Sequence, residues 1–344
     1  MLINTLQKHK YALINAFKTT LASFIGFLVG HFLGDWMNMP EMYSWIVITI
    51  LVIMSAQTNM GGLTNKSIMR MLGTLWSVLI ALVILLVFST LPAMQVILCL
   101  IFIYIGAFIA ATYPKYSYVG LLGAVTLAII LFASDPNIKF ALSRGFEIIL
   151  GIIIAFIVGR FVFPIHASKR IFHSYSDCLI QIRTLHRELV DGGKYELLLA
   201  QIFTHFNKQI TLTSEIMYEN QKKRIKDYQA LNYATRQLYR YICVSYEYIH
   251  AYPEKRAEFA EHPEFIALHS SISEALNHLS DNFASLNTQN HVEIEKLNAQ
   301  FSAFKSTLHL APEYIHVSTL VFSLTRTLQM LEEVYAIQKR IFNT

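Results

Sequence analysis

Charged side chains are scarce in the first 164 residues of this chain. Only four acidic and nine basic residues occur there, and long apolar runs fill the space between them. One globular interior could not hide so much apolar sequence from water. A chain with runs of this length and number instead matches the hydrocarbon of a lipid bilayer. The sequence therefore predicts a membrane-embedded first half.

The second half of the chain has no excess of basic residues. The whole chain has 28 basic and 23 acidic residues, so residues 165–344 hold 19 of each. The net charge of +5 thus belongs entirely to the apolar half. A soluble nucleic-acid-binding domain should carry the basic excess itself, and this chain does not fit that class.

Cysteine is also rare, and no catalytic motif is visible. Cys99, Cys178 and Cys243 are too far apart for a disulfide framework or a zinc site. We find no nucleotide-binding loop, no nucleophile–base set and no cleavable signal peptide. Two E-x-x-H tetrapeptides, starting at Glu247 and Glu313, would suit a di-iron bundle if they lay mid-helix. Because each lies beside a proline at a predicted helix end, we expect no metal there. Since no catalytic set or nucleotide-binding loop is present, we also expect no cofactor and no enzymatic activity.

Six apolar runs are present in the first half, and most are long enough to cross about 30 Å of hydrocarbon at 1.5 Å per residue. The second is short and would fall short of a full crossing unless its helix continues. The runs are Ala12–Gly34, Tyr43–Gln57, Met69–Ser89, Ala93–Thr112, Tyr116–Ser134 and Leu142–Phe163. We therefore predict an all-α protein with a six-helix transmembrane unit over residues 1–164.

Basic residues in the predicted loops set the orientation. They occur at the N-terminus, between the second and third runs, between the fourth and fifth, and after the sixth, whereas the opposite loops are poorer in them. Because positive loops stay on the cytoplasmic side, both termini should be cytoplasmic. We expect a multi-pass protein of the bacterial inner membrane.

Residues 165–344 have helical periodicity and no strand pattern, which predicts a cytoplasmic helical bundle. Glycine and proline mark the expected breaks. The predicted helices are 168–191, 195–220, 222–252, 263–286, 292–310 and 312–342.

The ionisable residues inside the apolar runs are the first candidates for function: Lys18, Arg144, Glu147 and Arg160. Each costs several kcal/mol in lipid (roughly 3 on insertion scales), so it is usually retained for a pathway or a partner. Arg144 and Glu147 are three residues apart and can pair on one helix face. Glu147 is then either a proton-coupling carboxylate or half of a structural ion pair. Arg160, like Arg70, could also simply reach the headgroups.

Lys18 begins a stripe of small residues at four-residue spacing, Ala22, Gly26, Gly30 and Gly34. Gly151, Ala155 and Gly159 repeat that spacing in the sixth run. Such stripes allow close helix packing. The alternative is that the Lys18 stripe faces a substrate path or a second subunit.

A polar, glycine-containing segment precedes the third run. It contains Asn59, Gly61, Gly62 and Lys66, and Arg70 follows one turn later. A loop with free N–H groups, capped onto a helix by Thr64 or Asn65, would form an anion-binding mouth with the two basic side chains. A plain cytoplasmic turn with positive charges explains the same residues.

The segment WIVITILVIMSAQTNMGGLTNKSIMRMLGT, with Arg144, Glu147, Ile148 and Gly151 in the pattern R-x-x-E-I-x-x-G, resembles the fusaric acid resistance protein family. Its relatives include bacterial aromatic acid exporters and plant aluminium-activated malate channels. The resemblance covers roughly residues 10–165. It implies a six-helix unit that passes organic anions, often aromatic carboxylates. Many members carry the unit twice and this chain once, which implies a homodimer.

Three functions follow from these features. The first is an exporter of aromatic or amphipathic carboxylates, with proton motive force as a candidate energy source. Its substrate path would include Lys18, Asn59, Gly61, Gly62, Lys66, Arg70, Arg144, Glu147 and Arg160. The second is a passive anion channel. The third is a membrane-anchored helical scaffold for envelope assembly. The expected partners are the organic anion, membrane lipids and a second copy of the chain, with no nucleic acid.

Overall fold

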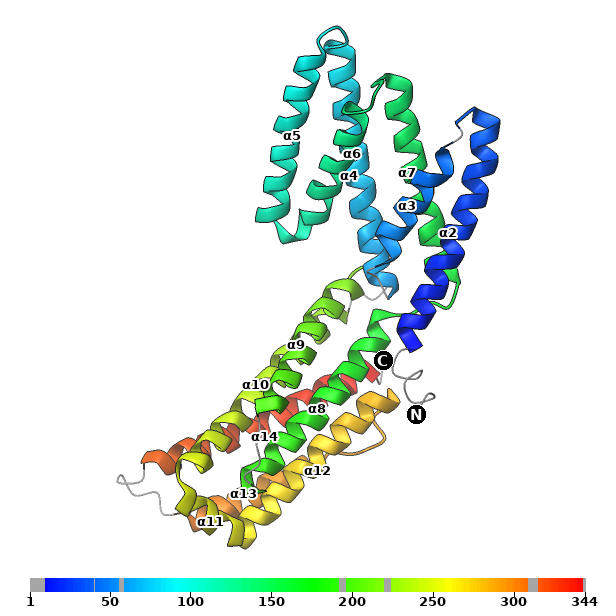
Figure 1. Ribbon diagram of the computed structural model, residues 1–344. Helices are drawn as coiled ribbons and strands as arrows, with labels where there is room; N and C mark the ends of the chain where they lie inside the picture. The colour runs from blue at the N-terminus through cyan, green and yellow to red at the C-terminus, as the bar shows by residue number, and fades with distance from the viewer. Residues whose placement is uncertain are drawn as a thin grey trace. The chain divides into compact units, whose positions relative to one another are not determined.

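The computed structural model describes residues 10–39, 41–55, 59–191, 196–219, 224–308 and 315–342 (Figure 1). Across these ranges the chain is helical and contains no strand, as the sequence predicts. The chain divides into two compact units, Met1–His166 and Ala167–Thr344. The division falls two residues after the composition changes at Pro164.

The N-terminal unit consists of helices separated by short segments of chain. Its elements are α2 (Lys10–Met37), α3 (Met42–Met54), α4 (Met60–Val87), α5 (Pro92–Thr112), the 3-10 turn η1 (Pro114–Tyr116), α6 (Ser117–Leu131) and α7 (Ile138–Phe161). Five of these helical segments, with η1 and α6 taken together, are long and apolar enough to cross a membrane. The helix α3, with 13 residues, is shorter. At 1.5 Å per residue it spans about 20 Å, so its crossing would be incomplete without further chain.

The prediction for the start of α4 is wrong. We expected a loop up to Lys66 capped by Thr64 or Asn65, but the helix begins at Met60 and includes Gly61, Gly62 and Lys66. Asn59 is the cap: its backbone is extended, and its side-chain oxygen accepts a hydrogen bond from the Gly62 N–H at 2.9 Å. A side-chain oxygen at this position satisfies one of the N–H groups that a helix leaves unpaired.

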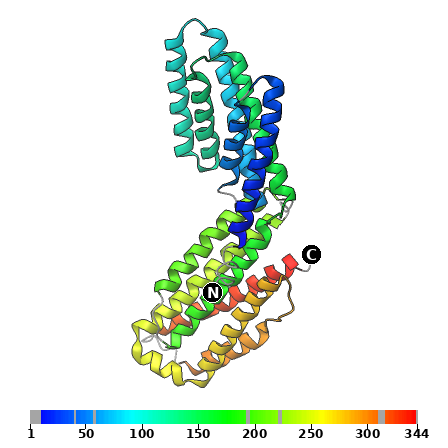
Figure 2. The ribbon, with the colours of Figure 1, turned by 45° about the vertical axis from the view of Figure 1, so that its right-hand side comes forward.

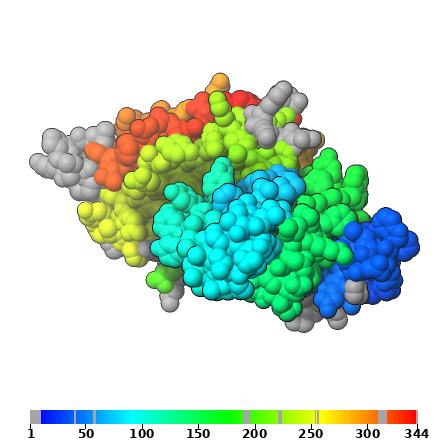
Figure 3. Space-filling view, turned by 90° about the horizontal axis from the view of Figure 1, so that it is seen from above, coloured from blue at the N-terminus to red at the C-terminus, as the bar shows by residue number. Residues whose placement is uncertain are grey.

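Helix packing in this unit follows the sequence α2–α3–α7–α4–α6–α5, in which each helix contacts the next. Seen end-on, the α6–α7 end (green) lies between the α4–α5 end (cyan) and the α2–α3 end (blue) (Figure 3). The five buried residues of α2 are Lys18, Ala22, Gly26, Gly30 and Gly34. A Cβ at Gly30 would lie 2.5 Å from the Tyr43 Cα. The stripe on α2 therefore packs on α3, as ordinary helix packing requires.

The C-terminal unit is a bundle of long helices (Figure 2). Its helices are α8 (Ala167–Asp191), α9 (Glu196–Ile216), α10 (Ile225–Ala251), α11 (Pro253–Glu261), α12 (Pro263–Ser285), α13 (Ile294–Thr307) and α14 (Ile315–Phe342). The sequence did not predict α11, because we interpreted Pro253 only as a helix breaker. Proline is favourable at the first helical position, where its missing N–H has no partner to lose. Pro253 thus starts a helix here.

The start of α8 is held by a side chain distant in the sequence. The buried carboxylate of Glu219 accepts hydrogen bonds from the N–H groups of Ala167, at 2.6 Å, and Ser168, at 3.3 Å. Negative charge is favourable at a helix N-terminus. No local pattern indicated this cap, because Glu219 lies 52 residues from Ala167.

Two stacked histidines join α8 to α12. The rings of His186 and His269 lie 4.2 Å apart, and each Nε2 approaches the other residue's carbonyl oxygen, at 2.8 Å and 3.3 Å. Burial, and then the neighbouring His269, hold the pKa of His186 well below its usual 6.5. His186 is therefore neutral at physiological pH.

Acid should destabilise this unit through His186. In the unfolded chain the His186 side chain takes up a proton near pH 6.5, whereas in the folded protein it stays neutral at that pH. The free energy of unfolding therefore falls as the pH drops, by up to about 1.4 kcal/mol per pH unit. Thermal unfolding of the full chain at pH 8 and pH 5.5 tests this. The variant His186→Phe should lose less stability between the two pH values. The exposed His173→Gln on the same helix should keep the wild-type dependence, and equal losses in all three would contradict the assignment.

Candidate functional site

An ion pair lies near the start of α7, in the N-terminal unit. An Arg144 Nη lies 2.7 Å from a Glu147 carboxylate oxygen, and both side chains are buried. The Arg144 guanidinium also lies 4.6 Å from the ring centroids of both Trp45 and Phe140. The pairing is as predicted, but the two aromatic faces were not. Phe140 is one turn from Arg144, so helical spacing could have indicated it.

Lys18 is buried without a carboxylate partner among the described residues. Its ammonium donates a hydrogen bond to the carbonyl oxygen of Gly159, 3.0 Å away, near the end of α7. That carbonyl carries only a partial charge, so it supplies no full countercharge to the Lys18 ammonium in an interior of low polarity.

Arg70 is also buried, so the alternative that it reaches the lipid headgroups is wrong. One of its Nη groups donates to the carbonyl oxygen of Leu122 on α6, at 3.3 Å. Its Nε has no partner in the described part of the chain, and neither has the hydroxyl of Ser67, one turn earlier on α4. Buried donors without partners are rare, and a water or a ligand usually satisfies them.

The three buried cations lie at different depths along the unit. Gly159 of α7 packs against Leu63 of α4, and Gly145 packs against Val78. Lys18 contacts Gly159, Arg144 precedes Gly145, and Arg70 lies about halfway between Leu63 and Val78. With 1.5 Å per residue, the series extends over about 22 Å in steps of about 10 Å. The cations thus form a ladder through the unit rather than a single cluster.

Buried positive charge exceeds buried negative charge in this unit. Among its described residues, Lys18, Arg70 and Arg144 are buried, and Glu147 is the buried acid. The pair at Arg144 cancels one charge, which leaves two cations bonded to carbonyl oxygens only. An interior of this kind attracts anions, because a mobile anion would supply the missing countercharge.

The predicted anion-binding mouth at the start of α4 is largely used by the protein itself. The N–H of Met60 donates to the carbonyl oxygen of Ile165, and the N–H of Gly62 donates to Asn59. Gly61 and Gly62 are buried. Lys66 is half-buried, with its ammonium 5.2 Å from the Tyr118 ring centroid, and Arg160 is exposed. These residues therefore do not form a loop of free N–H donors, as the predicted mouth requires.

An apolar cavity of about 370 Å³ lies between α4, α5 and α6. Trp76, Phe102 and Ile109 line it together with several glycines, and Ser77 supplies a hydroxyl. That hydroxyl is 2.6 Å from the Gly123 carbonyl oxygen, next to the residue that Arg70 contacts. The cavity offers an apolar surface close to a buried cation.

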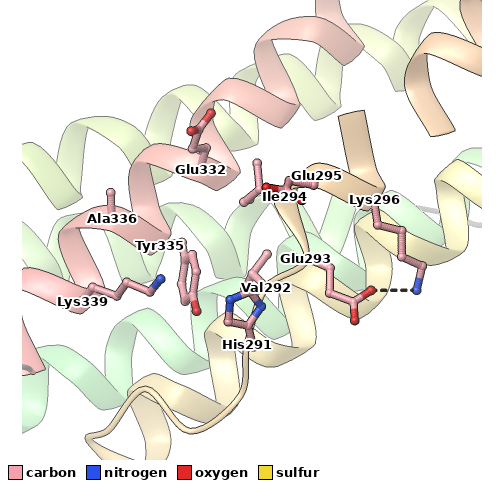
Figure 4. A pocket seen from close by; sticks show the side chains of 10 residues that line it. All are labelled: His291, Val292, Glu293, Ile294, Glu295, Lys296, Glu332, Tyr335, Ala336 and Lys339. Atoms are coloured by element: carbon pink, nitrogen blue, oxygen red, sulfur yellow. Dashed lines mark ion pairs between the residues drawn. The ribbon is translucent and has the colours of Figure 1, made fainter. Parts of the chain in front are cut away.

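A second hollow, of about 550 Å³, lies on the C-terminal unit between α13 and α14 (Figure 4). Its basic groups contact other groups of the same groove. Lys339 lies 4.3 Å from the Tyr335 ring centroid, and Lys296 pairs with Glu293 at 3.2 Å. The groove therefore contains no buried cation of the kind found at Lys18 and Arg70.

No group of three or more potential metal-ligating side chains occurs in the part of the chain that the structure describes. Glu313, from the second E-x-x-H tetrapeptide, falls outside the described residues. The first tetrapeptide lies at the end of α10, as expected.

The sequence profile of the fusaric acid resistance protein family matches residues 12–341. The chain belongs to this family. The match continues through α8–α14, so the resemblance is not confined to the first 165 residues. Membership makes the chain a membrane transport protein of the efflux type rather than a typical enzyme. No curated protein matches the chain.

Proposed function

We propose that this protein exports organic anions with an aromatic or otherwise amphipathic body across the bacterial inner membrane. Residues 1–164 lie in the membrane, residues 165–344 form a cytoplasmic domain, and both termini are cytoplasmic. The observation that carries the proposal is the ladder of Lys18, Arg70 and Arg144, which leaves two buried cations without a carboxylate.

A ladder of cations suits an anion path for an electrostatic reason. A bare carboxylate in hydrocarbon costs several kcal/mol, and a fixed cation about every 10 Å offsets this cost in stages. None of these cations should bind the anion too tightly, because the anion must also leave each site. Lys18 and Arg70 can each exchange a carbonyl oxygen for a cargo carboxylate.

The apolar cavity explains why the cargo should be amphipathic. An aromatic ring in the cavity beside Trp76 would place its carboxylate near α6, where Arg70 binds the Leu122 carbonyl. Rings gain from such contacts with aromatic side chains. A short aliphatic acid would leave the cavity empty and bind more weakly.

Flux measurements on the purified full chain in proteoliposomes test the proposal. Substituted benzoates should cross the membrane of these vesicles at least ten times faster than they cross protein-free vesicles. They should also cross faster than acetate, which carries the same charge. An outward-directed proton gradient should drive accumulation of the anion in the vesicle lumen against its concentration gradient, because an exporter moves its cargo against the flow of protons. Absence of flux for every carboxylate would overturn the proposal and favour the scaffold.

A passive anion channel is the second candidate, and the same cations support it. It differs in needing no coupling group, so that Glu147 would only hold Arg144. Downhill flux without accumulation under any proton gradient would identify the channel.

A further inference from the structure

The outward face of α9 lacks the charges expected of a surface helix. This helix lies at an edge of the C-terminal bundle in both ribbon views and packs on α8 and α10 (Figures 1 and 2). From Glu196 to Met217, a range that the structure describes completely, Lys208 and Glu196, at the first position of the helix, are the only charged residues among the exposed ones. A polar or charged outer face is normal for a soluble bundle.

Large and small side chains alternate on this face at seven-residue spacing. Phe203, Ile210 and Met217 are exposed by 52%, 49% and 45%. Ala200, Asn207 and Ser214 are exposed smaller residues, each three positions before one of the large ones. A seven-residue repeat keeps one continuous seam facing a partner helix. We call these six residues the α9 seam.

The seam is complementary to itself in an antiparallel arrangement. If two copies of α9 pair about a two-fold axis between Lys208 and Gln209, Phe203 lies opposite Ser214 of the other copy. In the same register Ile210 faces Asn207, and Met217 faces Ala200. Each large side chain then meets a small one, which permits close packing. A two-fold interface requires this self-matching of one patch.

We propose that the α9 seam is the contact between two copies of this chain, formed by antiparallel pairing of their α9 helices. The proposal is independent of the cargo and of transport. It commits to a second copy because both the apolar stripe and its small-residue counterpart lie on one helix, so a single surface supplies both halves of the fit. Lys208 lies beside the seam, where solvent can screen its charge.

Disulfide cross-linking of the full chain in membranes tests the pairing. With the three native cysteines replaced by alanine, Asn207→Cys lies close to the axis and should cross-link to its own copy on mild oxidation. Ala200→Cys and Met217→Cys, each about 25 Å along the helix from its own copy, should not. The double variant carrying both should cross-link, because each new thiol then faces the other. A parallel pair would instead cross-link every single variant, which would overturn the antiparallel proposal.

A charge in the seam supplies the second test. Phe203→Glu should reduce the Asn207→Cys cross-link at least tenfold and lower the molar mass in detergent from dimer to monomer. The matched control is Phe322→Glu on α14. Phe322 is also 52% exposed and, like Phe203, contacts a tyrosine of α10 edge-on. Equal effects of the two variants, or a monomeric wild type, would overturn the proposal.

Discussion

Glu147→Gln should abolish accumulation of the anion while leaving the protein folded and downhill flux measurable. The carboxylate is buried and bonded to Arg144 at 2.7 Å, and glutamine keeps its shape and one acceptor oxygen without the charge. If Glu147 carries the coupling proton, the loss of its carboxylate uncouples anion transport from the proton gradient. Uptake with and without a proton gradient, in the same proteoliposome preparation, measures the difference.

The partner variants separate coupling from structure. Arg144→Gln alone leaves Glu147 buried without a counterion, which should cost about 3 kcal/mol or more and reduce the amount of protein in the membrane. The double variant Arg144→Gln/Glu147→Gln removes both charges, so folding should recover while accumulation stays absent. Recovery of accumulation in the double variant would show that the pair only stabilises α7.

Lys18→Met should lower anion flux at least tenfold and leave the protein as stable as the wild type, or more so. The lysine is buried and donates to the carbonyl oxygen of Gly159 at 3.0 Å, with no carboxylate to compensate its charge among the described residues. Methionine has a similar length and removes a cation that costs several kcal/mol in lipid. If Lys18 had only a structural role, its replacement by methionine would cause no loss of anion flux.

The conservative variant Lys18→Arg supplies the control, since it keeps the charge at the same depth and should keep part of the flux. Lys139→Gln supplies a second, because Lys139 is an exposed basic residue of the same α7 helix and has no predicted place in the substrate path. Its flux should stay within about twofold of the wild type. If Lys18→Met transports as well as Lys18→Arg, positive charge at this depth is not needed.

The periodic features of the sequence predicted much of the site. Residues four apart on α2, and three apart on α7, must share a helix face, so the buried stripe and the Arg144–Glu147 pair followed from spacing. The cap at Asn59 was missed because several residues of that segment can cap a helix and only the backbone conformation selects one. The start at Pro253 was missed for a related reason, since proline both ends and begins helices.

The depth of each cation could not be obtained from the sequence. Arg70 is one of two basic residues near a predicted helix start, which suggested a headgroup contact, yet it bonds a carbonyl 52 residues away. Likewise Trp45 covers Arg144 from a different helix. Such contacts depend on which helices are neighbours and on their relative heights, and neither is encoded in a local pattern.

By itself the sequence determined that the first half is helical and apolar, that few charges lie within it, and which of them share a helix face. It could do so because hydrophobicity and helical spacing are local properties. Only the tertiary structure decided that Lys18, Arg70 and Arg144 lie buried at successive depths and that α9 keeps an apolar face uncovered. Burial and neighbours are set by contacts between helices distant along the chain, where packing selects among faces that the sequence alone leaves equivalent.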